Sequence, residues 1–338
     1  FMVLKYFLSF ILVFSSLFIA HSKDLHNITV GYSDTLEITK EATSMVCFGF
    51  EADHPSNHCV SEYVDAETMW DQLMNNEIQV ALMPEEVLIA NQKKRPQPLI
   101  ITPLYQQYLI LIGNHDVSME SVQSFKDRTI GVTDWATKEY RGKPLSIALG
   151  LKERDVYFPI TNSRTQLADM FCSFAIDGIM IMSDPSSPLA RELTTSCNGQ
   201  IMSFTDQQIQ QAMKSSLGLY PAIIPKGMFW RVDEDIKTLR SRVFLVVNPK
   251  KNVTNSILES LDHIKDEINL TTLRTHITAE SILETYDIKP IKLHPEGESL
   301  MNALRKEQTL AKEAEAKATQ LLVQSPDESQ HGNQVLPR

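Results

Sequence analysis

The four cysteines are the residues whose chemistry this sequence constrains most directly. Cys47 and Cys59 lie close together in the chain, and so do Cys172 and Cys197. Four cysteines can pair in three ways, and these spacings favour two local disulfide bonds. Each bond would close a short loop and stabilise the fold by about 2–4 kcal/mol.

Motifs for metal binding or catalysis are poorly represented. His54 and His58 lie between Cys47 and Cys59, which would allow a zinc site instead of the first disulfide, but the spacing matches no common zinc finger. The sequence contains no G-x-S-x-G or H-E-x-x-H motif and no glycine-rich phosphate loop. We therefore expect a protein that is not an enzyme and that has no cofactor or metal.

The overall charge is acidic. The 338 residues carry a formal net charge of −10, and the lysines and arginines form no basic cluster, so nucleic acid is not an expected partner. The hydrophobic content of 43% is sufficient for ordinary packed cores.

The first 22 residues have the composition of a secretory signal peptide. Lys5 precedes an apolar run that ends near Ala20, and cleavage is expected near Ser22. A membrane anchor is the alternative, but the run is shorter than the roughly 20 residues that a spanning helix needs. Export to the periplasm would also favour disulfide bonds between the cysteines.

Strands alternate with helices along the remaining chain, which predicts an α/β fold with mainly parallel sheets in two lobes. The predicted elements include strands at 79–84, 99–114 and 242–248 and helices at 135–149 and 278–287. In such folds the ligand lies at the carboxyl ends of the strands, in the crevice between the lobes. The expected divisions are the first part of lobe 1 at 23–113, lobe 2 at 114–221, the return to lobe 1 with C-terminal helices at 222–304, and a charged helix with a disordered tail at 305–338.

Five stretches, taken in order, carry a family resemblance. They are NNEIQVALMPEEV, SVQSFKDRTIGV, FCSFAIDGIMIMSDPSSPLARELTTSC, LYPAIIPKGMF and IKLHPEGESLMNAL. Their order and spacing resemble the TAXI-type solute-binding proteins of tripartite ATP-independent periplasmic (TRAP) transporters, over Ile28 to Leu304. The resemblance implies the type II periplasmic-binding fold with a hinge. It also implies a small solute as ligand, and TRAP membrane subunits as partners. The four cysteines fall where one subgroup of the family has two disulfides.

The chain departs from the family at the loops that would hold the ligand. Glycines of the family pattern are replaced around Asp65, Asp134 and Asp184, and an acidic pair begins at Glu85. Uncompensated acids would repel a carboxylate, so we expect a neutral or cationic solute, with a ring face from Trp135 or Tyr32. The expected ligand-binding residues are Tyr32, Ser33, Asp65, Glu67, Glu85, Thr133, Asp134, Trp135, Thr137, Asp184 and Tyr220.

Structural roles are the alternative for each of these residues. Asp134 can cap its helix, Glu85 and Glu86 can complement a helix dipole as acids of the first turn, and Trp135 can belong to the core. His294 and Pro295 are expected to form a turn and packing element.

Other functional classes are also open. A diverged two-lobed protein could act as a sensor or in host interaction without a transport role, and the triplets at Asn27, Asn252 and Asn269 would allow a secreted glycoprotein. For the solute-binding protein we expect a monomer.

Overall fold

The structure is a computed structural model that describes residues 26–33, 37–132, 150–151, 156–157, 163–184, 187–215, 218–264 and 291–324. The predicted signal peptide, the helix expected from Trp135 and the tail from Ser325 lie outside this part of the chain. All of residues 265–290, which include the last predicted helix before Pro290, also lie outside it.

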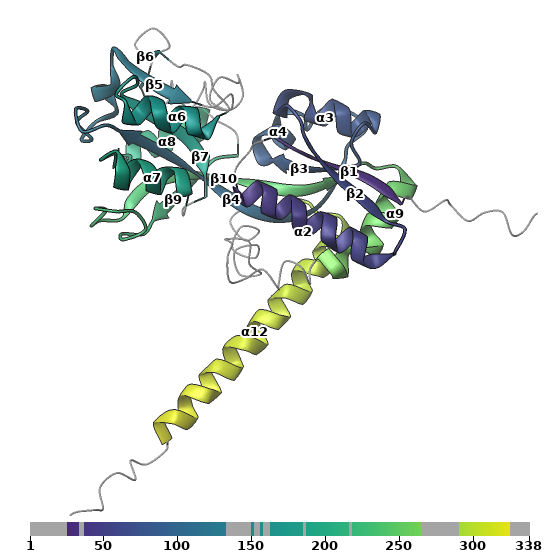
Figure 1. Cartoon of the computed structure of the whole chain (residues 1–338). Coiled ribbons are helices and arrows are strands. Elements are labelled where there is room, and N and C mark those ends of the chain that lie inside the picture. Colours follow the sequence, from purple (N-terminus) through teal and green to yellow (C-terminus); the bar gives the residue numbers. More distant parts are fainter. Residues whose placement is uncertain are drawn as a thin grey trace, which may run out of the picture.

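The elements form two lobes that share one ten-stranded sheet (Figure 1). Lobe 1 contains three parallel strands with α2, α3, α4 and α9 around them, and lobe 2 contains three further parallel strands with α6, α7 and α8. The elements of lobe 1 are β1 (Asn27–Tyr32), α2 (Glu37–Asp53), β2 (His58–Tyr63), α3 (Ala66–Asn75), β3 (Val80–Pro84), α4 (Glu85–Ala90) and α9 (Lys251–Glu259). The elements of lobe 2 are the 3-10 helix η1 (Val122–Phe125), β5 (Arg128–Val132), β6 (Val156–Tyr157), α6 (Arg164–Cys172), β7 (Gly178–Ser183), α7 (Pro188–Ser196), β8 (Gln200–Ile201), α8 (Asp206–Ser215) and β9 (Tyr220–Ile224).

Two long strands pass from one lobe into the other. They are β4 (Leu99–Gly113) and β10 (Ile236–Val247), which pair with each other in antiparallel orientation. β10 pairs with β9 in lobe 2 up to Arg240 and with β3 in lobe 1 from Val243 onward. The strand order β2-β1-β3-β10-β4-β7-β5-β6 therefore places a parallel triplet at each end and the crossing strands in the middle.

This arrangement confirms the expected two-lobed α/β architecture of the type II periplasmic-binding fold. Within each triplet the strands are parallel, as the alternation of strands and helices predicts. The crossing strands are antiparallel to their neighbours β3 and β7, so the sheet as a whole is mixed.

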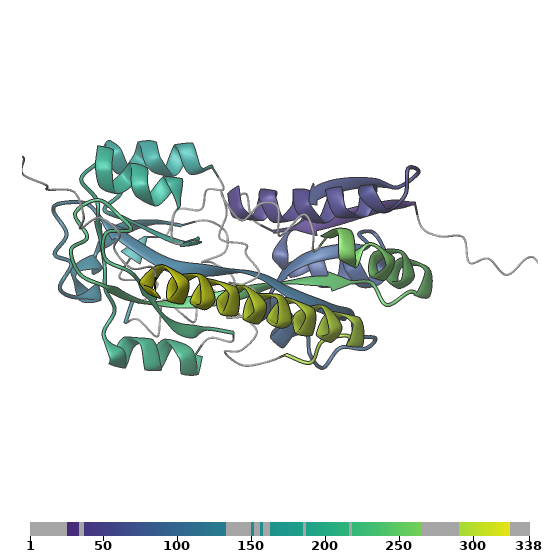
Figure 2. The ribbon, with the colours of Figure 1, turned by 90° about the horizontal axis from the view of Figure 1, so that it is seen from below.

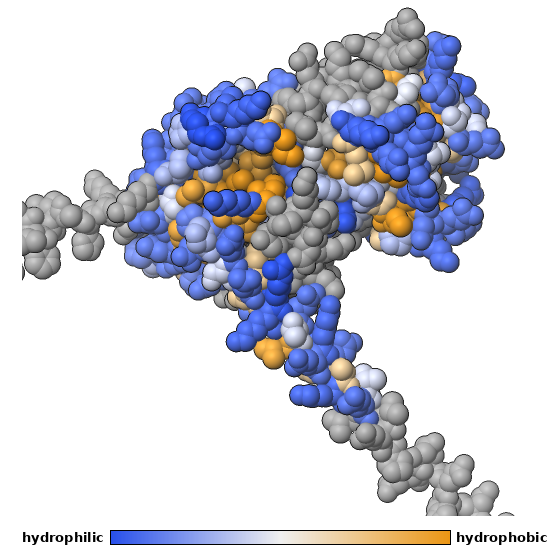
Figure 3. Space-filling model, turned by 180° about the vertical axis from the view of Figure 1, so that it is seen from behind, coloured by the Kyte–Doolittle hydropathy of each residue, from blue (hydrophilic) through white to orange (hydrophobic). Residues whose placement is uncertain are grey.

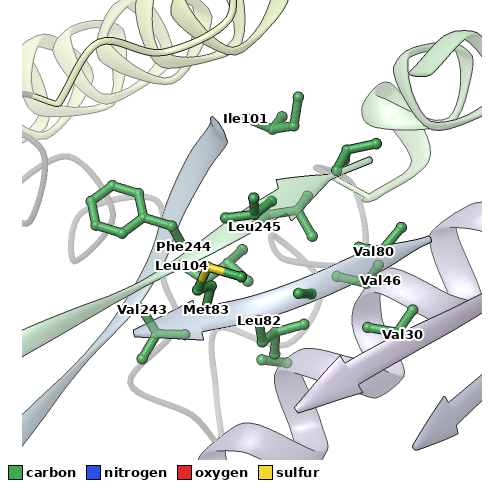
Figure 4. Close-up of a cluster of buried hydrophobic side chains, with 14 of the residues drawn as sticks. Val30, Val46, Val80, Leu82, Met83, Ile101, Leu104, Val243, Phe244 and Leu245 are labelled. Carbon is green, nitrogen blue, oxygen red and sulfur yellow. The ribbon is translucent and has the colours of Figure 1, made fainter. Parts of the chain in front are cut away.

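Lobe 1 has its own apolar core. Side chains from β1, β3, β4 and β10 meet beneath the helices, and nine of them, including Val30, Leu82 and Leu245, are labelled in Figure 4 together with Val46 of α2. Helix α3 contributes Met69, Trp70 and Leu73 to this core from one face, because these residues recur at helical spacing. Burial of such a face is the main source of stability for a helix this short.

Lobe 2 has two cores, one on each face of its sheet. In β7, Ile179 and Ile181 belong to one core, whereas Met180 and Met182 belong to the other. This division follows from the two-residue period of a strand that is covered on both faces. Helices α6 and α7 cover the first face, and α8 with η1 covers the second.

Both local disulfide bonds are present. Cys47 of α2 is bonded to Cys59 of β2, with their Cα atoms 5.2 Å apart. Cys172, the last residue of α6, is bonded to Cys197 just after α7, at a Cα distance of 5.1 Å. The zinc alternative at Cys47 and Cys59 is therefore excluded by the bond between the two sulfur atoms. Across the described chain there is also no group of three or more metal-ligating side chains.

The last helix, α12 (Pro295–Gln324), begins against lobe 1 and then leaves the body of the protein (Figures 1 and 2). Leu300, Met301 and Leu304 are buried in the lobe 1 core, whereas residues 309–320 are exposed. Figure 3 shows mostly hydrophilic side chains along the projecting part. The predicted turn at His294 is confirmed, because its backbone N–H donates to Ile100 O and its Nδ1 accepts from Glu296 N at the helix start.

Three elements differ from the sequence expectations. β10 begins at Ile236 rather than at Arg242, and α8 and β9 were not expected. The first half of β10 contains polar residues from Lys237 to Arg242, so its sequence lacks the apolar pattern that predicts a strand. These residues lie where the chain passes between the lobes. None of the helices that the structure describes is long and apolar enough to span a bilayer.

Candidate functional site

The carboxyl ends of the parallel strands point toward the junction of the two lobes. In lobe 1, β1 is parallel to β3 and β3 is antiparallel to β10, so both strands run antiparallel to β10. In lobe 2, β7 runs antiparallel to β4. Since β4 and β10 are themselves antiparallel, the strands of lobe 1 and lobe 2 end facing each other. Residues just after β1, β3 and β7 therefore lie toward the middle of the molecule.

The crossing strands are polar at the same level. Gln106 and Gln107 interrupt the apolar sequence of β4, and they pair with Arg242 and Ser241 of β10. Gln106, Gln107, Ser241 and Arg242 are all buried. A buried polar group needs hydrogen-bonding partners, so polar residues gathered here indicate a built site rather than ordinary core.

Arg242 is the centre of this junction. Its guanidinium is fully buried and donates from Nε to Glu85 Oε2 over 2.6 Å and from Nη2 to Glu85 Oε1. Tyr220 also donates its hydroxyl to Glu85 Oε1, over 2.7 Å, and accepts from Arg242 Nη2 over 3.0 Å. A carboxylate from α4, a guanidinium from β10 and a phenol from β9 thus form one network.

Burial and neighbouring groups affect the protonation of Tyr220 and the placement of the Arg242 guanidinium. Burial raises the pKa of Tyr220 well above its usual value, and the hydrogen bond to Glu85 and the charge of Glu85 raise it further. The guanidinium carbon of Arg242 lies 4.8 Å from the centre of the Tyr220 ring and 5.2 Å from that of Phe244. Both distances are within the range of a cation–π contact.

Glu86 lies beside this network and contacts a different strand residue. Its buried carboxylate accepts from Ser241 Oγ over 2.8 Å. Gly218, just before β9, approaches the start of α4 so closely that a Cβ atom on it would lie 3.1 Å from Glu86 N. With a φ of +67° this residue also has a backbone conformation that favours glycine.

Two buried hydroxyls at the strand ends have no hydrogen-bond partner among the described residues. Ser33, after β1 in lobe 1, is 6% exposed, and Ser183, the last residue of β7 in lobe 2, is 1% exposed. Neither Oγ atom is hydrogen-bonded to any group that the structure describes. Because unsatisfied buried hydroxyls are costly and rare, they mark positions where a ligand would supply the missing bond.

The other expected residues of lobe 1 lie near the same strand ends. The half-buried Tyr32 ring packs edge-on against Tyr63 at 6.1 Å. Asp65 caps α3, since its Oδ1 accepts from Glu67 N over 2.8 Å, and Glu67 is exposed in the first turn of that helix. The structural alternative for Asp65 is therefore confirmed, and whether it also binds a ligand stays a prediction.

The expected residues of lobe 2 are described only in part. Asp184 is buried directly after Ser183, at the end of β7. Thr133, Asp134, Trp135 and Thr137 follow β5 in the chain and lie outside the described residues. The predicted contribution of that loop therefore stays a prediction.

The structure corrects one premise of the sequence reasoning. Glu85 is not an uncompensated acid, because the guanidinium of Arg242 neutralises it. Glu85 alone therefore gives no reason to expect a cationic ligand. Arg242 and Ser183 are the residues that the sequence reasoning missed. The signal for Arg242 was a charged residue within an apolar strand, while its partner lies far away in the chain at Glu85.

The search of solved structures finds matches of low sequence identity, and three of them are structures of arginine-binding proteins. One is an ancestral arginine-binding protein bound to arginine, with 10% identity, a TM-score of 0.45, and coverage of 78% of this chain and 98% of that chain. Another is a Salmonella typhimurium periplasmic binding protein with high arginine specificity, with 9% identity, a TM-score of 0.45, and coverage of 76% and 100%. A third is an amino acid ABC transporter substrate-binding protein from Streptococcus pneumoniae bound to L-arginine, with 9% identity, a TM-score of 0.42, and coverage of 79% and 97%.

The search of curated proteins gives no match. A family model, in contrast, matches residues 88–297, which include both crossing strands, all of the described lobe 2 and the residues Tyr220 and Arg242. That segment is more than half of the chain, and this protein therefore belongs to the NMT1-like family.

Proposed function

We propose that this protein is an exported solute-binding receptor that captures a small polar solute between its two lobes. The observation that carries the proposal is the pair of unpartnered buried hydroxyls, Ser33 and Ser183, one at a strand end of each lobe. A solute that bonds to both lobes stabilises the arrangement in which both can reach it. Binding is thereby converted into a shift of the lobe equilibrium.

The proposal includes a route for the solute. The predicted signal peptide would carry the chain to the periplasm, where the two disulfides are stable. The resemblance to TAXI-type proteins supports a TRAP-type membrane transporter as the partner that receives the solute.

A native mass spectrum of protein purified from the periplasm tests this function. A co-purified small molecule that is lost on denaturation is the expected result. A thermal-shift screen of amino acids, dicarboxylates and polyamines then identifies the solute class. At about 100 times its dissociation constant, a true ligand should raise Tm by about 5 °C.

Two variants connect the binding to the proposed site. Ser33→Ala and Ser183→Ala should each weaken binding of the identified solute about tenfold, since each removes one hydrogen bond of roughly 1.4 kcal/mol. Neither should lower the stability of the ligand-free protein, because neither hydroxyl has a described partner to lose. Ser256→Ala in α9 is a control, because this hydroxyl already donates to a backbone carbonyl far from the junction. Unchanged affinity in both site variants would place the solute elsewhere.

A further inference from the structure

Three donors converge on the carboxylate of Glu85. Arg242 provides two of them, from Nε and Nη2, in the side-on geometry with which a guanidinium recognises a carboxylate through both oxygens. Tyr220 provides the third, from its hydroxyl to Oε1 over 2.7 Å. This is the donor set expected of a binding position for an external carboxylate group.

The carboxylate and its donors come from different parts of the fold. Glu85 begins α4 in lobe 1, directly after β3, whereas Tyr220 begins β9 in lobe 2. Arg242 lies on β10 between the segment that pairs with β9 and the segment that pairs with β3. The carboxylate of Glu85 thus joins lobe 1 to a donor of lobe 2, as a solute bound between the lobes would.

The donors are positioned by groups other than Glu85. The guanidinium of Arg242 lies over the rings of Tyr220 and Phe244, and Phe244 is itself fully buried in the lobe 1 core. Tyr220 is held by the β9–β10 pairing, directly opposite Arg240. Removing the carboxylate would therefore leave both donor residues, Arg242 and Tyr220, in place around an empty position.

We propose that Arg242 and Tyr220 form a carboxylate-binding position that the chain fills with its own Glu85. The internal carboxylate excludes external carboxylates from Arg242 and helps to hold the lobes together without a solute. The inference rests on the proposed function in one respect: it assumes that a solute between the lobes would reach this position if Glu85 did not occupy it. It implies that the natural solute is not held through a carboxylate on Arg242, and it makes Glu85 a specificity-determining residue.

Acetate is the matched probe, because Glu85→Ala removes a group equivalent to acetate. The Tm of the full-length E85A variant is measured with increasing sodium acetate, against sodium chloride at equal ionic strength. We expect acetate to raise this Tm saturably, by about 5 °C once it reaches about 100 times its dissociation constant. Wild-type protein should show no such rise, because its own carboxylate occupies the position.

Three controls assign the effect to the guanidinium. Glu85→Gln fills the same space with a neutral amide and should not respond to acetate. The double variant E85A/R242M lacks the charged donor and should also not respond. Acetamide, which has the shape of acetate without its charge, should not stabilise E85A. An equal response of wild type, of E85A/R242M or of E85A with acetamide overturns the proposal.

A variant that does not fold still gives an answer. If E85A is unfolded in chloride, its refolding is followed by circular dichroism in acetate and in chloride, and recovery in acetate alone supports the proposal. Recovery in neither salt contradicts it. The experiment does not use the natural solute, so acetate binding to E85A and the presence of a co-purified solute in wild type succeed or fail separately.

Discussion

Arg242 and Glu85 form a buried ion pair at the point where the chain passes between the two lobes. The side chain of Arg242 is 0% exposed and that of Glu85 is 2% exposed, and Nε lies 2.6 Å from Oε2. Taking two charges out of water is costly, and geometry of this quality is needed to offset it. The pair therefore contributes less to net stability than to fixing how β3, α4 and β10 fit together.

Replacing only one member of this pair should be strongly destabilising. Arg242→Met would leave the Glu85 carboxylate buried without its guanidinium, at a cost of about 3–5 kcal/mol in the free energy of unfolding. The double variant E85Q/R242M should be more stable than R242M, because it no longer contains the buried Glu85 carboxylate that R242M leaves without a guanidinium. Urea unfolding followed by circular dichroism gives the free energy of unfolding of wild type, R242M, E85Q and E85Q/R242M. Additive effects of the two substitutions would show that the pair is not coupled.

Tyr220 should make stability depend on alkaline pH. Burial, the hydrogen bond from its hydroxyl to Glu85 and the charge of Glu85 raise the pKa of Tyr220 above its usual 10.0. Above that pH the unfolded state loses a phenol proton that the folded state keeps, so this contribution is full below pH 10 and falls as pH rises further. The limiting slope is about 1.4 kcal/mol per pH unit for one proton.

Tyr220→Phe isolates that contribution. The variant should be less stable than wild type by about 1.5–3 kcal/mol at neutral pH, because the hydroxyl donates to a charged carboxylate. The difference between the two proteins should shrink from pH 10 upward as wild type loses its advantage. Tyr63→Phe is the comparison for a tyrosine that is largely exposed. A constant difference across the pH range would contradict the raised pKa.

Much of the fold could be predicted because its signals are local. The apolar run from Leu99 to Gly113 and the short apolar strand Val80–Pro84 lie where the sequence predicts them. Both disulfides follow from close cysteine spacing. These features depend on neighbours a few residues away, and sequence patterns record such neighbours well.

The site was predicted less completely because its chemistry depends on distant contacts. Nothing near Glu85 in the chain indicates that Arg242 neutralises it, since β10 joins β3 only after the whole of lobe 2 has intervened. The first half of β10 was not predicted as a strand because its residues from Lys237 to Arg242 are mostly polar. They are polar because they lie at the lobe junction, whose position depends on contacts between distant parts of the chain. Ser183 reads as a loop residue until its burial and missing partner are seen.

Gly218 should tolerate a side chain less well than a matched glycine on the surface. Both Gly218 and Gly227 have a positive φ, of +67° and +78°, and alanine at either position should cost about 1 kcal/mol for the backbone conformation. At Gly218 the added Cβ would also lie 3.1 Å from Glu86 N, whereas at Gly227 no described atom beyond its two chain neighbours would lie within 4 Å of it.

The two alanine variants therefore separate backbone strain from contact across the lobe junction. Gly218→Ala should lower the free energy of unfolding by about 1–3 kcal/mol more than Gly227→Ala, because crowding adds to the backbone term. Urea unfolding gives both values under the same conditions. Equal losses would mean that the start of α4 can move away from Gly218 without cost.

The projecting part of α12 should contribute little to the stability of the two lobes. Ending the chain at Glu307 removes exposed residues of α12 but leaves the buried Leu300, Met301 and Leu304 in place. Far-UV circular dichroism should show a loss of helix, while Tm changes by less than about 2 °C. Leu304→Ala in the full chain should instead cost about 2–5 kcal/mol, because it empties part of the lobe 1 core. A large drop in Tm on truncation would show that the exposed helix contacts the lobes in solution.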